Sequence, residues 1–304
     1  MQRHNVGAGQ RTSLPAHDMA PPSVPSHPLI AHWQAQARRH IATVDGCRVC
    51  WRAFGSGPAL VLLHGGHGSW LHWVRNIEAL AGRFTVWVPD LPGYGDSDVP
   101  ASGDLQALLD ATSASMDVIV GTNTPIDLAG FSFGGLVAAH LATRHHQVRR
   151  LVLLGPAGHG GERRPRGKLL NWQDAARAGD AAALDAVMRH NLAVHMLHDE
   201  AAIDPLAVAL HTAACMAARF RSKHISRAGG LADALAQHQG EQLIVWGEHD
   251  VTAEPALLAA RLCKGHTRRR ACVVPAAGHW VQYEQARAVD DLLLGARPQA
   301  APGS

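Results

Sequence analysis

Short apolar runs recur along the chain, and each run leads into Gly, Pro or His. Six of them occupy residues 59–63, 84–88, 126–129, 151–154, 243–246 and 271–274. Near-continuous apolar runs of this length are typical of strands that are buried on both faces, as in a parallel sheet. The pattern therefore predicts a mostly parallel sheet whose two faces are both covered.

The segments between these strands carry apolar residues at helical spacing. Residues 70–81, 105–120 and 134–144 each place apolar side chains on one face of a helix. Strands that alternate with helices imply right-handed crossovers and an α/β fold with a doubly wound sheet. Upstream, residues 41–54 alternate around Asp45-Gly46, which predicts an antiparallel hairpin leading into the parallel sheet.

The alternation stops between residues 157 and 230, which are rich in Ala and contain no strand pattern. Two apolar stripes recur there at helical spacing. They are Leu184, Met188, Leu192 and Met196, and then Leu206, Leu210 and Ala213. A helical insertion between two strands predicts a cap over the strand ends, and the alternative is a set of ordinary helices that cover the sheet.

These patterns divide the 304 residues into four parts. Residues 1–37 are rich in Pro, Ser and His and are predicted to form a mobile tail. Residues 38–156 and 231–304 form the two parts of the α/β core, and residues 157–230 form the inserted cap. Apolar residues make up 47% of the chain, which is enough for one sizeable core.

The charge balance argues against a nucleic-acid partner, because the formal net charge is only +3 and charged residues are 17% of the chain. The short basic stretches Arg163-Arg164-Pro165-Arg166 and 268–270 are interpreted as solvated turns. No apolar run approaches the roughly 20 residues that span a bilayer, and no secretory signal is visible near the N-terminus. We therefore expect a cytoplasmic protein with no membrane partner.

The cysteines predict reduced thiols and no metal site. Five are present, at Cys47, Cys50, Cys215, Cys263 and Cys272. An odd number in a long chain argues against a disulfide scaffold. Cys47 and Cys50 form a C-x-x-C pair, but they lie in a predicted strand and no second pair follows, so zinc is not expected.

The strongest chemical signal is Gly130-Phe131-Ser132-Phe133-Gly134, a G-x-S-x-G motif between a predicted strand and a predicted helix. A sharp strand-to-helix turn holds the Ser in a strained conformation, and the flanking glycines leave room for nearby backbone. The Ser132 hydroxyl is then exposed at the helix N-terminus, where the helix dipole favours developing negative charge. Ser132 is the predicted nucleophile.

A serine hydroxyl is a weak nucleophile at neutral pH and needs a base within hydrogen-bond reach. Among the 21 histidines, His279 follows the last predicted strand, where sites gather in open α/β sheets. Asp250 and Glu248 follow the preceding strand, and either one can orient the base. Asp250 is preferred, because a short side chain a few residues into the loop can reach across to His279.

An ester or amide substrate passes through a tetrahedral intermediate, whose oxyanion needs backbone donors. The predicted oxyanion hole uses the N–H of Phe133, directly after the nucleophile, and the N–H of Gly66 in the loop after the early strand. His67 is the second choice for the loop donor. Phosphate binding is the alternative for Gly65-Gly66, but the Lys-Ser/Thr pair of a nucleotide loop is missing.

Taken in order, these motifs resemble the α/β-hydrolase superfamily. The similar stretches are His64-Gly65-Gly66, Asp90 to Ser97, the motif around Ser132, the acid Asp250 and Gly278-His279-Trp280. The chain order Ser132, Asp250, His279 is the order of that superfamily's triad. The resemblance runs from about residue 41 to the C-terminus, and it implies an α/β-hydrolase sheet with a structural role for Asp90.

The segment from His279 to Glu284 is also similar to the carbon–carbon bond hydrolases that cleave ring-fission products of aromatic degradation. That resemblance implies that Trp280 helps to shape the substrate pocket. His67 and Phe131 are further candidate pocket residues. Those enzymes tend to carry Asn where this chain has Phe131. They also use a cap arginine, for which the candidates are Arg189, Arg219 and Arg221.

The predicted activity is hydrolysis of an ester or amide of a small, largely apolar molecule through an acyl-enzyme. The cap is expected to build an apolar pocket over Ser132, and no metal or organic cofactor is implied. Three alternatives use the same fold: carbon–carbon bond hydrolysis of a vinylogous diketone, a cofactor-free oxygenase or perhydrolase, and a ligand receptor. A small-molecule substrate is the expected partner, and the oligomeric state is left open.

Overall fold

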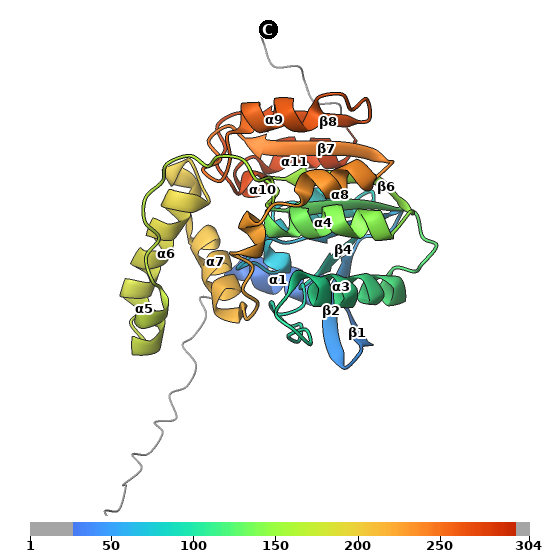
Figure 1. The fold of residues 1–304 in the computed structure, drawn as a ribbon. Coiled ribbons are helices and arrows are strands. Elements are labelled where there is room, and N and C mark those ends of the chain that lie inside the picture. The colour runs from blue at the N-terminus through green and yellow to red at the C-terminus, as the bar shows by residue number, and fades with distance from the viewer. Residues whose placement is uncertain (1–26, 296–304) are drawn as a thin grey trace, which may run out of the picture.

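The structure, a computed structural model, describes residues 27–295. Eight strands form one sheet in the order β1-β2-β4-β3-β5-β6-β7-β8 (Figure 1). They are β1 (Arg38–Val44), β2 (Cys47–Phe54), β3 (Ala59–Leu63), β4 (Thr85–Pro89), β5 (Ile126–Phe131), β6 (Val148–Leu154), β7 (Glu241–Gly247) and β8 (Arg269–Val274). The β1–β2 and β2–β4 pairs are antiparallel, and the other pairs are parallel. The predicted hairpin and mostly parallel sheet are confirmed.

Both faces of the sheet carry an apolar layer, because successive residues of a strand point to opposite faces. In β3, Leu60 and Leu62 join one layer, whereas Val61 and Leu63 join the other. One layer is covered by α3 (Leu105–Ile119), α4 (Phe133–Arg144), α8 (Leu231–Gln237) and α9 (Pro255–Cys263). The other is covered by α1 (Pro28–Gln36), α2 (Ile77–Ala81) and α11 (Ala286–Leu293).

The last part of the predicted tail is wrong, because α1 belongs to the folded core. Pro28 starts this helix, where its missing N–H needs no partner, and the His27 side chain accepts the Leu29 N–H at 3.2 Å. Ile30 and Trp33 are buried against the sheet. The remainder of the predicted tail, residues 1–26, lies outside the described residues.

The segment predicted as one helix over 70–81 is divided into two elements. Ser69 caps the 3₁₀ turn η1 (Trp70–Trp73), and α2 begins only after Asn76. The buried Asn76 amide donates to Asp290 Oδ1 at 2.8 Å on α11. This bond between distant parts of the chain holds the start of α2 at a place that local spacing does not indicate.

The chain between β6 and β7 supplies helices that lie beyond one end of the sheet (Figure 1). They are α5 (Gln173–Ala178), α6 (Ala181–His195) and α7 (Pro205–Ala217), with the 3₁₀ turns η2 (Glu200–Ala202) and η3 (Ile225–Arg227). Asp180 and Asp204 cap α6 and α7 by accepting backbone N–H groups. The stripe at Leu184, Met188 and Leu192 is buried. The domain limits 157–230 stay a prediction.

None of the helices within residues 27–295 combines the length and apolar character needed to cross a bilayer.

Candidate active site

Ser132 lies at the turn between β5 and α4, with φ 53° and ψ −116°. This φ is in the left-handed region, which residues other than glycine adopt rarely and at an energetic cost. The Ser132 N–H donates to the Leu154 carbonyl at 2.8 Å and so holds the turn against β6. A Cβ at Gly130 would overlap the Gly134 carbonyl, and one at Gly134 would overlap the His64 carbonyl. The close approach of these backbones explains the glycines of the motif.

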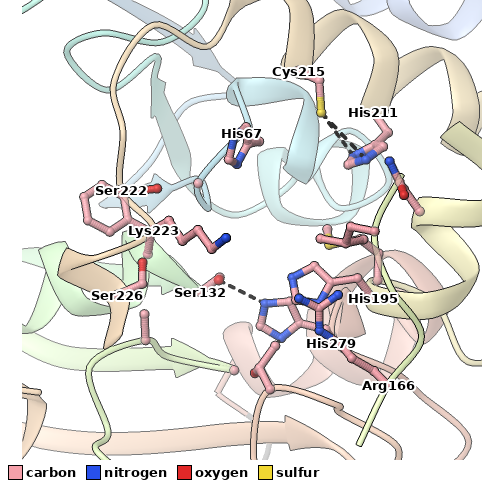
Figure 2. Close-up of a pocket in the computed structure, with 18 of the residues that line it drawn as sticks. His67, Ser132, Arg166, His195, His211, Cys215, Ser222, Lys223, Ser226 and His279 are labelled. Carbon is pink, nitrogen blue, oxygen red and sulfur yellow. Dashed lines mark hydrogen bonds between the residues drawn. The ribbon is translucent and has the colours of Figure 1, made fainter. Parts of the chain in front are cut away.

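His279 lies in the loop between β8 and α10 (Val281–Glu284) and contacts both other members of the predicted triad. Its Nε2 is 2.9 Å from Ser132 Oγ, a contact that Figure 2 shows, and its Nδ1 is 2.9 Å from Asp250 Oδ2. An ionised carboxylate only accepts, so Nδ1 carries the proton and Nε2 is free to accept the Ser132 hydroxyl. An arrangement of this kind can take up a serine proton during nucleophilic attack.

Asp250 is fully buried and is held in its ionised form. Burial acts to raise its pKa, but His279 and Thr252 more than offset that effect, and the pKa lies below its ordinary value. The Thr252 N–H and hydroxyl both donate to Asp250 Oδ1 at 2.7 Å. Glu248, the other candidate for the acid, accepts the Ala276 N–H at 3.1 Å through its Oε2, whereas Asp250 is the carboxylate that contacts His279.

Thr252 is a site residue that the sequence analysis missed. Its hydroxyl is also 3.2 Å from His279 Nδ1, so it touches both the acid and the base. An aspartate side chain commonly closes a local turn by accepting the N–H two residues later, and a threonine at that position can add its hydroxyl as a second donor. That spacing is the signal that would have indicated it.

Two buried histidines hold the Gly-rich loop that follows β3. His64 Nε2 accepts the Leu91 N–H at 2.9 Å, so its Nδ1 carries a proton and donates to the Gly65 carbonyl at 2.8 Å. His72 Nδ1 accepts the Gly65 N–H at 3.2 Å. Burial lowers the pKa of both imidazoles, which keeps them neutral, as their acceptor roles require.

The two predicted oxyanion donors lie beside the nucleophile. Gly66 and Phe133 line the same cavity as Ser132. Phe133 is the first residue of α4, where the helix itself supplies no acceptor for the N–H. The Gly66 N–H donates to no protein acceptor within residues 27–295. Both groups are thus available to a ligand oxygen, and their role in an oxyanion hole stays a prediction.

A cavity of about 440 Å³ opens over Ser132, between the strand ends and the helices α6 and α7. His67 and Phe131 line it, as expected of pocket residues. Trp280 does not line it, so its predicted place in the pocket wall is wrong. Trp280 is fully buried, stacks on Tyr283 and donates its indole N–H to the His72 carbonyl at 3.2 Å.

The proposed cap arginines also lie outside the cavity wall. Arg189 donates to Asp185 at 2.7 Å, and Arg219 donates to the carbonyls of Gly95 and Ser97. Arg221 is absent from the cavity lining as well. The cations that do line the cavity are Arg163, Arg166, Lys223 and Arg227.

Two earlier interpretations therefore need correction. The stretch 163–166 is more than a solvated turn, because Arg163 and Arg166 face the cavity over Ser132. The expected apolar pocket is in fact mixed, with charged and apolar side chains in its wall. The sequence shows that these residues are charged. It does not show which way their side chains point, because the segment is irregular.

A group of possible metal ligands, Cys50, Asp90 and Asp96, lies away from the cavity. The Arg52 guanidinium donates to Asp90 at 2.8 Å and also to Asp96. Asp90 further accepts the Trp70 N–H at 2.9 Å. Both carboxylates of the group thus pair with a protein cation, and the contacts of Asp90 are those of a structural residue.

Glu284 joins the His279 loop to the cap and was not predicted. Its Oε2 accepts the Gly278 N–H at 2.6 Å, and its Oε1 accepts the N–H groups of His198 and Asp199 at 2.7 and 2.8 Å. Burial raises the pKa of this carboxyl, against the opposing effect of the three donors. We therefore expect Glu284 to position His279 through the neighbouring Gly278.

We expect Glu284→Gln to lower kcat for the predicted hydrolysis about 10-fold with little change in KM, because an amide nitrogen replaces one charged acceptor and loosens the loop. Steady-state kinetics measure both constants. Glu248→Gln is the control, since that exposed carboxylate accepts a single N–H, that of Ala276, where Glu284 accepts three. An unchanged kcat in Glu284→Gln would contradict the positioning role.

A family profile and several known proteins are similar to this chain in sequence. Residues 60–292 match the profile of the alpha/beta hydrolase family. The soluble epoxide hydrolase of Corynebacterium sp. (strain C12) is 37% identical over 116 residues, which are 38% of this chain and 40% of that protein. The pimeloyl-[acyl-carrier protein] methyl ester esterase of Vibrio campbellii (strain ATCC BAA-1116) is 36% identical over 116 residues, 38% of this chain and 43% of that protein. The similarity thus spans about two fifths of the length of these relatives.

Solved structures share the fold over a longer part of the chain. Carboxylesterase CesB (YbfK) from Bacillus subtilis superimposes with a TM-score of 0.69 at 21% identity, covering 88% of this chain and 93% of that one. A meta-cleavage product hydrolase from Pseudomonas fluorescens IP01 gives a TM-score of 0.63 at 22% identity, covering 84% and 96%. With the family profile matched over most of its length, this chain belongs to the alpha/beta hydrolase family.

Proposed function

We propose that this protein is a serine hydrolase that cleaves carboxylic esters through an acyl-enzyme on Ser132. The observation that carries the proposal is the pair of 2.9 Å contacts from Ser132 Oγ to His279 and from His279 to Asp250. An esterase among the curated relatives and a carboxylesterase among the structural neighbours support ester hydrolysis as the reaction class.

In the first half of the reaction, His279 Nε2 takes the Ser132 proton while Oγ bonds to the ester carbonyl carbon. Asp250 stabilises the resulting imidazolium and keeps its orientation. The N–H groups of Phe133 and Gly66 donate to the oxyanion. The bond to the leaving oxygen then breaks, and the alcohol departs with the proton that His279 returns.

In the second half, water attacks the acyl group on Ser132, and His279 accepts the proton of that water. The bond between the acyl carbon and Oγ breaks, and Ser132 regains its proton from His279. One water is consumed for each ester bond, and the products are a carboxylic acid and an alcohol. His279 carries every proton transfer in this scheme.

Carbon–carbon bond hydrolysis is the second candidate, and it is supported by the likeness in fold to the meta-cleavage product hydrolase. Two assays separate the candidates: release of p-nitrophenol from p-nitrophenyl butyrate, and loss of the absorbance of a vinylogous diketone. We expect turnover of the ester at a kcat of about 1 s⁻¹ or more and no consumption of the diketone. Consumption of the diketone without ester turnover would overturn the proposal, as would turnover that requires oxygen or peroxide.

A further inference from the structure

The cavity over Ser132 has an unbalanced charge. Four cationic side chains line it, and no residue of its described lining is Asp or Glu. The cations come from two parts of the chain that meet only in the fold. They are Arg163 and Arg166 from the segment after β6, and Lys223 and Arg227 from the segment after α7.

These cations lack the carboxylate partners that neighbouring arginines have. Arg164 pairs with Glu254 at 3.1 Å, whereas none of the four cavity cations forms an ion pair within residues 27–295. The hydrogen bond that Arg163 forms within the described part of the chain is to the Ser226 carbonyl, at 3.5 Å, and that acceptor carries no charge. Arg163 and Arg164 are adjacent in the chain, yet among the residues that the structure describes only Arg164 pairs with a carboxylate, that of Glu254. Glu254 does not line the cavity.

The cations also repel one another. Burial lowers the pKa of Arg163, and the positive charges of Arg227 and Arg166 lower it further, while the nearby Asp250 carboxylate acts in the opposite direction. Burial and the charge of Arg227 also lower the pKa of Arg166. A guanidinium keeps its proton at neutral pH, so this repulsion between the cations persists. A bound anion would relieve it, and guanidinium groups match the geometry of carboxylate and phosphate oxygens.

The positions of the cations relate the charge to the reacting atoms. Figure 2 shows Lys223 reaching into the cavity beside Ser132, with Arg166 across from it near His195 and His279. Burial lowers the pKa of His67, and Lys223 lowers it further. Burial, His279 and then Arg166 lower the pKa of His195. The positive charges thus act within the space that a substrate at Ser132 would fill.

The rest of the wall is apolar or neutral. Its apolar members include Phe131, Leu169, Leu170, Trp172 and Met196. A ligand that fits both kinds of surface has an apolar body and one charged end. All four cations are exposed to solvent. A purely apolar ligand that covered them would displace their water without offering a partner, which is costly.

We propose that the ester cleaved at Ser132 carries an anionic oxygen group, a carboxylate or a phosphate, which lies among Lys223, Arg163, Arg166 and Arg227. This inference rests on the proposed ester hydrolysis and specifies its substrate class. It replaces the expectation of a largely apolar substrate with that of an amphipathic acid.

The test compares three p-nitrophenyl esters of equal chain length: the glutarate monoester with a free carboxylate, its carboxamide counterpart and its phosphonate counterpart. We expect kcat/KM for at least one anionic ester to exceed that of the carboxamide about 10-fold, and the preferred anion identifies the group recognised. The preference falls as ionic strength rises, because salt screens exposed charges.

Lys223→Met and Arg166→Met are each expected to lower the ratio of anionic to carboxamide kcat/KM about 10-fold, because each removes one charged donor. Arg221→Met is the matched control, since Arg221 lies two residues from Lys223 but outside the cavity lining, and it should keep the ratio of the wild type. A purely structural effect lowers both rates and leaves the ratio unchanged. An unchanged ratio in both cavity variants, or a wild type that prefers the carboxamide, would overturn the proposal.

Binding without turnover separates this inference from the proposed reaction. Ser132→Ala protein is titrated calorimetrically with glutarate and with glutaramide. Tighter binding of glutarate supports anion recognition even if no ester is cleaved, and the failure then belongs to the proposed reaction. Equal binding of the two compounds, with ester turnover intact, overturns the anion site alone.

Discussion

Ser132→Ala is expected to lower kcat/KM for ester hydrolysis by a factor of about 10⁵ or more, because Ser132 carries the hydroxyl that His279 Nε2 contacts. The fold should survive the change. The hydrogen bonds that hold the turn use the Ser132 backbone, which accepts the Gly135 and Ala157 N–H groups at 2.9 Å and donates to Leu154. The substitution removes only the hydroxyl, whose protein contact is His279 Nε2. Ester kinetics and the thermal unfolding midpoint are the two readouts.

The chain offers a matched control on α3, where the same three residue types meet. Ser113 Oγ lies 2.7 Å from His145 Nε2, and His145 Nδ1 lies 3.6 Å from Asp117. Ser113 belongs to the body of a regular helix and does not line the cavity. Ser113→Ala should retain wild-type activity. Activity of Ser132→Ala within about 100-fold of the wild type would contradict the covalent mechanism, because loss of a triad serine costs far more.

The second large effect is expected from Asp250→Asn, which should lower kcat by a factor of about 10⁴. Thr252 donates twice to Oδ1, so that atom stays the acceptor and the new amide NH₂ faces His279. His279 Nδ1 must then accept, and the ring proton moves to Nε2. In that tautomer His279 cannot take up the Ser132 proton. KM should change little, because Asp250 is buried behind the imidazole.

The α3 trio again supplies the control, and Asp117→Asn should leave kcat near the wild-type value. The measurements are kcat for both variants and the NMR resonances of the His279 ring nitrogens, which report the tautomer. A loss of activity in Asp250→Asn with the Nδ1–H tautomer intact would contradict the argument. So would an effect of equal size in Asp117→Asn.

The sheet was predictable because both of its faces are covered. Each central strand is then a nearly continuous apolar run, which stands out between helical patterns. α1 was missed because Ile30 and Trp33 are sparse apolar residues in a stretch rich in Pro and His. The division of residues 70–81 depends on Asn76 meeting Asp290, 214 residues away, and no local pattern reports such a contact.

The residues that meet at Ser132 were predictable to different degrees. Ser132, Asp250 and His279 each follow a strand, and the carboxyl ends of parallel strands share one edge of the sheet. The cations of the cavity wall were not predictable. They lie in irregular segments, where no regular spacing of apolar residues indicates which side chains face the cavity. Arg189 was avoidable as a candidate, since Asp185 precedes it by four residues in a helical pattern and pairs with it.

The central claim is that Ser132 attacks the substrate, and labelling with a fluorophosphonate followed by peptide mapping tests it most directly. We predict one adduct per chain, on the peptide that contains Ser132, and its loss in Ser132→Ala and His279→Ala. An adduct on another serine, or undiminished labelling in Ser132→Ala, would contradict the account.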